Sequence, residues 1–196
     1  MMHQRLWFGP TSMLTIIHSP VLLLLWNSIG NNMKTIVIDD YLDKDVYDML
    51  YKMYQSTKAG SDVKRTMFDH DPTPQIADLI NEFTNKREYD KLAKFIHTAA
   101  TPPNYNHKIH DEAEFKIMSA IVYIGPEKAP GTTFYIDGKE DAIEWKPNRL
   151  MVFCGESNVT WHDYKSDDNM RFTYNYFLID PTKVENETYK NYIIRM

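Results

Sequence analysis

The chain has 196 residues, of which 43% are hydrophobic and 13% are aromatic, and its formal net charge is −5. A chain of this length and composition can bury one sizeable core and is expected to form one domain. No run of Lys or Arg suggests a nucleic-acid footprint, so we expect no nucleic-acid partner. Cys154 is the only cysteine, which excludes an intramolecular disulfide and a multi-cysteine metal site. Any metal site must therefore use His, Asp and Glu.

The first 32 residues differ in composition from the rest of the chain. The stretch "MLTIIHSPVLLLLW" is apolar, but a His and a Pro interrupt it, and even residues 13–29 fall short of the roughly 20 apolar residues that a spanning helix needs. Residues 1–32 are interpreted either as a signal or membrane anchor, or as an extension or start-site artefact before a domain that opens at Met33, and we favour the second interpretation. Residues 33–196 then form the functional domain. We expect a cytoplasmic protein, with membrane anchoring or secretion as the alternatives.

The front half of the domain is rich in helical signals. Residues 34–38 are strand-like, and Asp43 precedes apolar residues at helical spacing over 46–54, which predicts a capped helix. Residues 60–71, "GSDVKRTMFDHD", are typical of a loop. A second helix is expected from Thr73-Pro74 to Phe83, because Pro is favoured at the first helical position.

The segment from residue 89 onward turns into β-structure. Residues 89–99 fit a helix or a strand equally well. Beyond residue 107 the sequence consists of short β-branched or aromatic runs separated by turn signals, namely "FKIMSAIVYI", "TTFYI", "AIEW", "RLMVFCG", "VTWHDY" and "MRFTYNYFLI". The chain is therefore expected to be α+β but mainly β, a sandwich or jelly roll with N-terminal helices packed outside.

Residues 105–116, "YNHKIHDEAEFK", contain the densest group of potential metal ligands. On a strand over 107–112, His110 and Glu112 would share one face, while Asp111 and His107 would point the other way. His162, between two strand-like runs, is the best candidate for a third ligand. Two imidazoles and one carboxylate form the facial triad of non-haem Fe(II), which leaves three coordination positions open.

A basic side chain follows the last candidate ligand. Arg171 and Thr173 would share one face of the strand "RFTYNYFLI". A guanidinium pairs with a carboxylate through two N–H donors, so an inward-facing Arg171 beside a hydroxyl is a natural anchor for a dicarboxylic co-substrate.

The order His110-x-Glu112, His162, Arg171-x-Thr173 resembles the Fe(II)/2-oxoglutarate-dependent dioxygenases, especially the prolyl-hydroxylase-like and small phage or bacterial types. The resemblance covers roughly residues 33–180 and includes "IVIDDYLD", "APGTTFYI" and "IEWKPNRLMVF". It implies a double-stranded β-helix (jelly roll). The carboxylate is Glu112 where the family more often has Asp, which leaves Asp111 as the alternative ligand.

The resemblance also implies an activity and its cofactors. Fe(II) would be held by His110, Glu112 and His162, while 2-oxoglutarate would be bound by Arg171 and Thr173, with Tyr123 as a further hydrogen-bond partner. O2 would be the second co-substrate, and ascorbate an optional reductant. The expected reaction is hydroxylation of a C–H bond with release of succinate and CO2.

Two readings from different classes remain open at this point. The first is the oxygenase, acting on a small-molecule or peptidyl substrate that the sequence does not identify. The second is a catalytically inert jelly-roll module that binds a metal or a partner. The complete set of ligands and carboxylate anchor favours the oxygenase, because a binding module has no reason to keep Arg171 at that offset.

Overall fold

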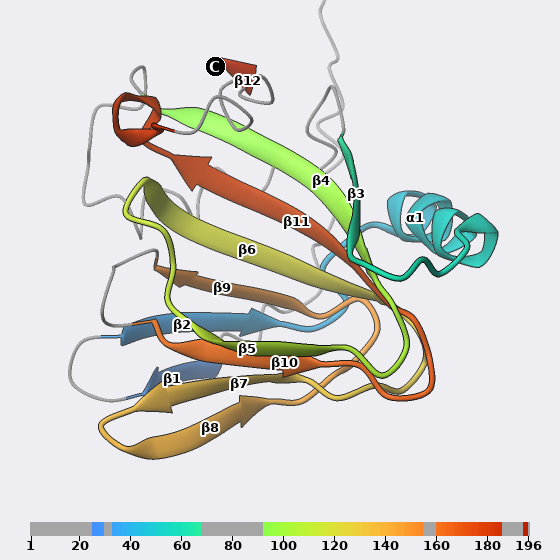
Figure 1. The fold of residues 1–196 in the computed structure, drawn as a ribbon, viewed down its shortest axis with the longest axis horizontal. Helices are drawn as coiled ribbons and strands as arrows, with labels where there is room; N and C mark the ends of the chain where they lie inside the picture. The colour runs from blue at the N-terminus through green and yellow to red at the C-terminus, as the bar shows by residue number, and fades with distance from the viewer. Residues whose placement is uncertain (1–24, 30–32, 68–91, 155–159, 186–193, 196) are drawn as a thin grey trace, which may run out of the picture.

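The computed structural model describes residues 25–29, 33–67, 92–154, 160–185 and 194–195, which form two antiparallel sheets (Figure 1). The larger, major sheet has the order β1-β2-β9-β6-β11-β4-β12, and β3 also pairs with β4. Its strands are β1 (Leu25–Ile29), β2 (Met33–Ile38), β3 (Lys64–Met67), β4 (Ala93–Thr101), β6 (Lys116–Gly125), β9 (Leu150–Cys154), β11 (Arg171–Ile179) and β12 (Ile194–Arg195). The smaller, minor sheet has the order β5-β10-β7-β8. Its strands are β5 (Asn106–His110), β7 (Thr132–Ile136), β8 (Lys139–Ile143) and β10 (His162–Lys165).

The chain alternates between the two sheets from β4 to β11. Strands β4, β6, β9 and β11 lie in the major sheet, and β5, the β7–β8 hairpin and β10 cross to the minor sheet between them. This alternation is the winding of a double-stranded β-helix. The predicted mainly β, jelly-roll architecture is therefore confirmed.

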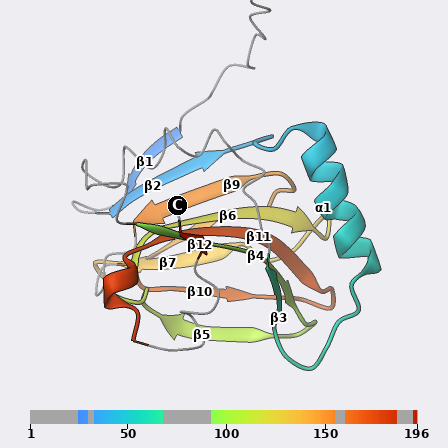
Figure 2. The same cartoon turned by 90° about the horizontal axis from the view of Figure 1, so that it is seen from above.

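Helix α1 (Lys44–Ser56) lies outside the sheets, at one end of the major sheet (Figure 2). It begins after Asp43, as the sequence predicts, although the Asp43 side chain makes no capping hydrogen bond. Leu50 is fully buried, and the Tyr47 hydroxyl donates to the carbonyl of Ile124 on β6 at 3.0 Å. The predicted second helix, 73–83, lies outside the described residues.

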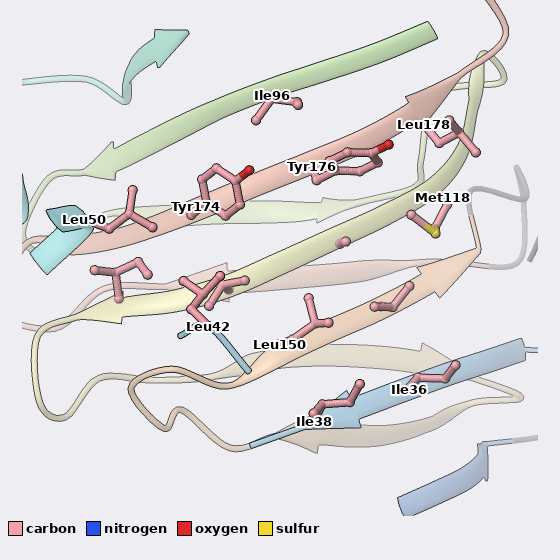
Figure 3. Packing of buried hydrophobic residues seen from close by; sticks show 14 of the residues in the cluster. Ile36, Ile38, Leu42, Leu50, Ile96, Met118, Leu150, Tyr174, Tyr176 and Leu178 are labelled. Carbon is pink, nitrogen blue, oxygen red and sulfur yellow. The ribbon is translucent and has the colours of Figure 1, made fainter. Parts of the chain in front are cut away.

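Two apolar cores lie on opposite faces of the major sheet. The outer core, shown in Figure 3, joins Leu50 of α1 to Tyr174, Tyr176 and Leu178 of β11 and to residues of β2, β6 and β9. The inner core lies between the sheets and consists of Tyr123, Phe134, Ile143, Trp145, Met151 and Phe153. Because side chains alternate along a strand, the even-numbered residues of β11 serve the outer core and its odd-numbered residues face the minor sheet.

Three segments differ from or extend the sequence expectations. The segment that is ambiguous by sequence forms β4, which is buried on both faces. The expected loop over 60–71 contains a strand, β3, whose residues are mostly exposed and therefore lack an alternating pattern. β1 lies within the proposed extension 1–32 and pairs with β2 from Leu25 to Ile29. The domain boundary at residue 33 stays a prediction.

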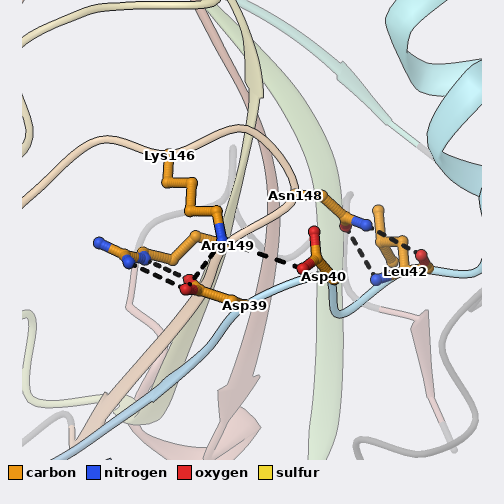
Figure 4. Close-up of polar contacts among 6 residues, drawn as sticks. All are labelled: Asp39, Asp40, Leu42, Lys146, Asn148 and Arg149. Atoms are coloured by element: carbon orange, nitrogen blue, oxygen red, sulfur yellow. Dashed lines mark hydrogen bonds and ion pairs between the residues drawn. The ribbon is translucent and has the colours of Figure 1, made fainter. Parts of the chain in front are cut away.

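The end of β2 is fixed to the turn before β9 by polar contacts (Figure 4). Asp39 accepts hydrogen bonds from Arg149 at 2.6 and 3.1 Å and from Lys146 at 3.0 Å. Asn148, which has a left-handed φ of 60°, accepts from the backbone N–H of Leu42 at 2.8 Å and donates to its carbonyl at 3.0 Å. These contacts hold the strands of the inner core in register. Within the part of the chain that the structure describes, no helix is long and apolar enough to cross a membrane.

Candidate active site

A cavity of about 120 Å³ lies between the two sheets. Its walls come from the inner faces of β4, β6 and β11 and from β3, β5, β7 and β10. The lining residues include the candidate ligands and anchors His110, Glu112, His162, Arg171 and Thr173. Tyr123 is the one candidate residue that does not line the cavity. Residues from three separate stretches of sequence therefore share one site.

His110 and His162 lie side by side on paired strands. His110 ends β5 and His162 begins β10, the two are direct partners in the ladder, and their ring centroids are 4.2 Å apart. Nδ1 of His110 contacts the carbonyl of Lys108 at 3.0 Å, and Nδ1 of His162 contacts the carbonyl of Thr160 at 2.6 Å. A carbonyl only accepts, so each Nδ1 carries the proton and each Nε2 keeps a lone pair.

The surroundings keep both imidazoles neutral. Phe134 and Phe153 of the inner core pack against the ring of His162, with centroids at 5.5 and 5.2 Å. Burial lowers the pKa of His162, and burial together with the neighbouring His162 lowers the pKa of His110 to about 4. Neutral imidazoles with Nδ1 held by a backbone carbonyl are the form in which histidine binds metals.

Glu112 reaches the cavity by a different route from the one the sequence suggests. β5 ends at His110, so Glu112 lies in the following turn and not on the strand face. Its buried carboxylate accepts hydrogen bonds from Ser119 at 2.7 Å and from Lys116. Burial alone would raise the pKa of Glu112, but Lys116, His162 and these hydrogen bonds outweigh it and lower the pKa. Asp111 does not line the cavity, and it accepts from Thr160 at 3.0 Å.

His107 faces the cavity, contrary to the strand-alternation argument. The ladder pairs His110 with His162 but His107 with Tyr164. Between these two pairs β5 advances by three residues and β10 by only two. This β-bulge turns the side chain of His107 to the inner side, where its ring lies 4.2 Å from that of His110.

Arg171 is a buried cation without an acidic partner among the described residues. It is 3% exposed, and its Nη2 donates to the Thr132 hydroxyl at 3.2 Å, while Nε has no hydrogen-bond partner. The rings of Tyr164, Trp145 and Tyr123 surround the guanidinium at 4.5, 5.2 and 5.4 Å. Burial lowers the pKa of Arg171, yet a guanidinium remains charged. A buried cation in this position requires an anion.

Tyr123 and Thr173 complete the surroundings of Arg171. They are direct partners on β6 and β11, and the Tyr123 hydroxyl donates to Thr132 at 2.9 Å. Thr132 therefore links Tyr123 to Arg171. The preceding Gly131 makes this placement feasible, because a Cβ there would lie 1.9 Å from the carbonyl oxygen of Ile143.

Several residues that contact the candidate residues had no role in the sequence interpretation, namely Thr132, Tyr164, Trp145, Lys116 and Ser119. They come from other parts of the fold, so sequence spacing carries no signal for them. Thr132 stands within the quoted "APGTTFYI", and its place after Gly131 was the one local hint.

The two histidines and Arg171 fit iron and 2-oxoglutarate, whereas the carboxylate ligand is not in place. Two neutral imidazoles lie side by side, and a buried guanidinium without an acidic partner among the described residues lies in the same cavity. In the described part of the chain, no three His, Cys, Asp or Glu side chains are arranged closely enough to hold a metal ion. The missing element is the Glu112 carboxylate, which Lys116 and Ser119 hold. Glu112 lines the same cavity as the two histidines.

Comparison with known proteins places the fold. No protein-family description matches the sequence, and no curated protein does. Among solved structures, the chain is similar to a prolyl hydroxylase from Trichoplax adhaerens in complex with a hypoxia-inducible-factor peptide fragment (TM-score 0.57, 14% identity, 76% of this chain and 84% of that one). It is also similar to the viral collagen prolyl hydroxylase of Paramecium Bursaria Chlorella virus-1 in a 2OG complex (TM-score 0.56, 18% identity, 76% and 96%). A 2OG-Fe(II) oxygenase family protein from Burkholderia pseudomallei matches with a TM-score of 0.52 and 12% identity over 74% and 84%.

These similarities, together with the alternation of strands between the sheets, define the class of fold. The chain has the double-stranded β-helix fold of the 2-oxoglutarate–Fe(II) oxygenases, and its neighbours include prolyl hydroxylases. The resemblance inferred from sequence motifs is thereby confirmed at the level of the fold.

Proposed function

We propose that the protein is an Fe(II)- and 2-oxoglutarate-dependent dioxygenase that hydroxylates a C–H bond of its substrate, with release of succinate and CO2. The observation that carries this proposal is Arg171, a buried cation that has no acidic partner among the described residues and lies in the same cavity as two neutral histidines. Desolvating a guanidinium is costly unless an anion compensates it. A dicarboxylic co-substrate supplies that anion.

Each residue has a distinct task in this proposal. His110 and His162 would hold iron through Nε2, and Glu112 would supply the carboxylate ligand after leaving Lys116 and Ser119. Iron, when bound, supplies the redox chemistry that activates O2. Arg171 and Thr173 would bind the far carboxylate of 2-oxoglutarate.

The walls of the cavity hold these groups in place and exclude water. The Thr132 hydroxyl oxygen accepts hydrogen bonds from both Tyr123 and Arg171, which fixes the guanidinium before the co-substrate arrives. Phe134 and Phe153 cover one side of His162. A dry cavity strengthens the pairing of Arg171 with a carboxylate.

The expected substrate is a small molecule or a peptide, with no nucleic-acid partner. One neighbouring structure is a prolyl hydroxylase bound to a peptide, which makes a peptidyl substrate one option for this chain. O2 is the second co-substrate and ascorbate an optional reductant.

Anaerobic visible absorption tests the proposal. Fe(II) and then 2-oxoglutarate are added to the metal-free protein, with His162→Ala and Arg171→Ala as the two variants. We expect a metal-to-ligand band that is absent in His162→Ala and that requires at least tenfold more 2-oxoglutarate in Arg171→Ala. Lys165→Ala, which changes an exposed residue of the same strand as His162, is the matched control and should keep the band.

A folded protein that develops no band would rule out the oxygenase. The inert jelly-roll module would then be the better description. One observation already favours that alternative, namely the Glu112 carboxylate held by Lys116 and Ser119, so the carboxylate ligand is the step to examine first.

A further inference from the structure

The inner face of the major sheet carries a second polar group beside the proposed 2-oxoglutarate contacts. The ladder places Arg65 of β3 opposite Ala99 of β4, and Ala99 opposite Thr173 of β11. The next row contains His97 opposite Asn175. Directly paired residues point to the same face, so Arg65, His97 and Asn175 border the same cavity as Thr173, and all of them line it.

His97 and Asn175 form a buried pair with unused hydrogen-bonding capacity. They are 1% and 4% exposed. The Asn175 amide nitrogen donates to His97 Nε2 at 3.3 Å, so the proton of the neutral ring is on Nδ1, which has no partner. Buried polar groups are normally paired, and a ligand in the cavity would supply the partner that the described residues do not give to His97 Nδ1.

Arg65 is the cation that the proposed function leaves without an anion. Among the described residues, four charged side chains line the cavity, and three of them are cations, namely Arg65, Lys116 and Arg171. Lys116 is paired with Glu112, and Arg171 is assigned to the co-substrate. Arg65 is exposed at the cavity opening and makes no ion pair with the residues that the structure describes. A predominantly cationic cavity in a chain of net charge −5 favours an anionic ligand over a neutral one.

Ala99 leaves open the path between Arg65 and the proposed co-substrate site. It lies between Arg65 and Thr173 in the row and is only partly buried, although its strand is central. Two strand spacings separate Arg65 from Thr173, which is roughly 10 Å between their backbones. A ligand of a few heavy atoms spans that distance above a methyl side chain.

We propose that Arg65 and the His97–Asn175 pair form the substrate subsite, and that the substrate carries an oxyanion, a carboxylate or a phosphate, bound by Arg65. The polar group next to that oxyanion hydrogen-bonds to Asn175 and His97. This inference rests on the proposed function, because it assigns the remaining part of the same cavity to the molecule that is oxidised. Arg65 and the pair are specificity determinants and take no part in the chemistry.

Binding of matched probes to the protein loaded with Zn(II) and 2-oxoglutarate tests the inference, since Zn(II) allows no turnover. The probes are the α-carboxamides of N-acetyl-L-glutamate against N-acetyl-L-glutamine, and of N-acetyl-O-phospho-L-serine against N-acetyl-L-serine, so that the second member of each pair is uncharged. Dissociation constants are measured by calorimetry. We expect an anionic probe to bind at least tenfold more tightly than its neutral partner. The pair with the larger ratio identifies carboxylate or phosphate as the recognised group.

The variant Arg65→Gln should reduce that ratio to about one while leaving the affinity for 2-oxoglutarate unchanged. Lys64→Gln is the matched control. Lys64 is exposed on the same strand, and its substitution removes the same charge from the opposite face of that strand. It should keep the ratio. In addition, the side-chain amide signals of Asn175 should shift in NMR spectra when the anionic probe binds.

Equal binding of anionic and neutral probes, including no binding of either, overturns the inference, as does a preference that survives in Arg65→Gln. Failure of the proposed function would look different. In that case 2-oxoglutarate itself would not bind to the Zn(II) protein. The ratio of dissociation constants for the paired probes, measured on protein without co-substrate, would still test whether Arg65 binds the oxyanion.

Discussion

His97 is an imidazole held in a place where it cannot accept a proton. Burial, together with the nearby positive charges of Arg65 and Lys116, lowers the pKa of His97 to about 3. In the unfolded chain the pKa of His97 returns to about 6.5. Between these two values the unfolded state binds one proton more than the folded state, so acidification stabilises the unfolded state.

We therefore expect His97 to make the protein sensitive to mild acid. From pH 7 to pH 5 the contribution of His97 to the free energy of unfolding should fall by about 2 kcal/mol, since one proton is worth about 1.4 kcal/mol per pH unit. Urea unfolding of the wild type and of His97→Gln at both pH values measures this. The variant should lose about 2 kcal/mol less than the wild type between the two pH values.

Each protein is compared with itself at the two pH values, so the change in the free energy of unfolding that the substitution causes at both pH values cancels. Other titrating groups, including His110 and His162, contribute equally to both proteins and cancel. Identical pH dependence in the wild type and in His97→Gln would mean that His97 takes up protons in the folded state. The neutral pair with Asn175 would then be incorrect.

At the scale of single residues, the sequence predicted which side chains share the cavity, but part of the strand geometry used for that prediction was incorrect. The order of His110, Glu112, His162 and Arg171 was sufficient to expect one cavity, and all four line it. The strand-face argument was wrong for Glu112, which lies in a turn, because sequence alternation does not show where a strand ends. The assignment of these residues as ligands and anchor stays a prediction.

Helix α1 is anchored to the major sheet through one fully buried residue. Leu50 is 0% exposed and belongs to the outer core, whereas its neighbour Met49 is 40% exposed. We expect Leu50→Ala to lower the free energy of unfolding by about 3 kcal/mol, because the substitution removes buried apolar atoms and leaves a cavity. Chemical denaturation followed by tryptophan fluorescence measures the change.

Met49→Ala on the same helix is the matched control. It removes a comparable side chain from the solvent side, so its effect should stay within about 0.5 kcal/mol. Equal losses in both variants would contradict the argument that the burial of Leu50 on the sheet sets its contribution to the free energy of unfolding. Alanine is the better helix former, so propensity alone cannot explain a loss in Leu50→Ala.

Elements with a clear apolar pattern could be predicted from the sequence, and elements without one could not. β6, β7, β9 and β11 coincide with runs of β-branched and aromatic residues. β3 could not be found, because it is an edge strand whose side chains are mostly exposed, so neither face selects apolar residues. The bulge in β5 was equally invisible, since an extra residue in a ladder is defined by the partner strand.

The distribution of charge over the whole molecule separates surface from cavity. The chain carries a net charge of −5, yet its one cavity with candidate ligands in the described residues has three cations among four charged side chains. The two arginines of this set differ in burial. Arg171 is enclosed and unpaired, whereas Arg65 stands at the opening. The buried one is a source of instability that a ligand can remove.

The stability of the whole molecule should therefore depend on the co-substrate. Without ligands, Arg171→Met is expected to raise the free energy of unfolding by about 2 kcal/mol, because replacing an uncompensated buried charge by an apolar side chain of similar volume is stabilising. With Zn(II) and 2-oxoglutarate at 100 times the dissociation constant, the wild type should gain about 2.7 kcal/mol. That gain corresponds to a rise in Tm of about 5–10 °C.

The order of stability should thus reverse when the ligands are added, since Arg171→Met should gain almost nothing from 2-oxoglutarate. Arg149→Met is the matched control, because Arg149 is paired with Asp39 at 2.6 Å. Its loss should lower the free energy of unfolding by about 0.5–1 kcal/mol with or without ligands. Differential scanning calorimetry on the three proteins provides the measurement. A ligand-free Arg171→Met that is less stable than the wild type would show that the surrounding tyrosines and Trp145 already compensate the charge, and the need for an anion in this cavity would no longer follow from burial.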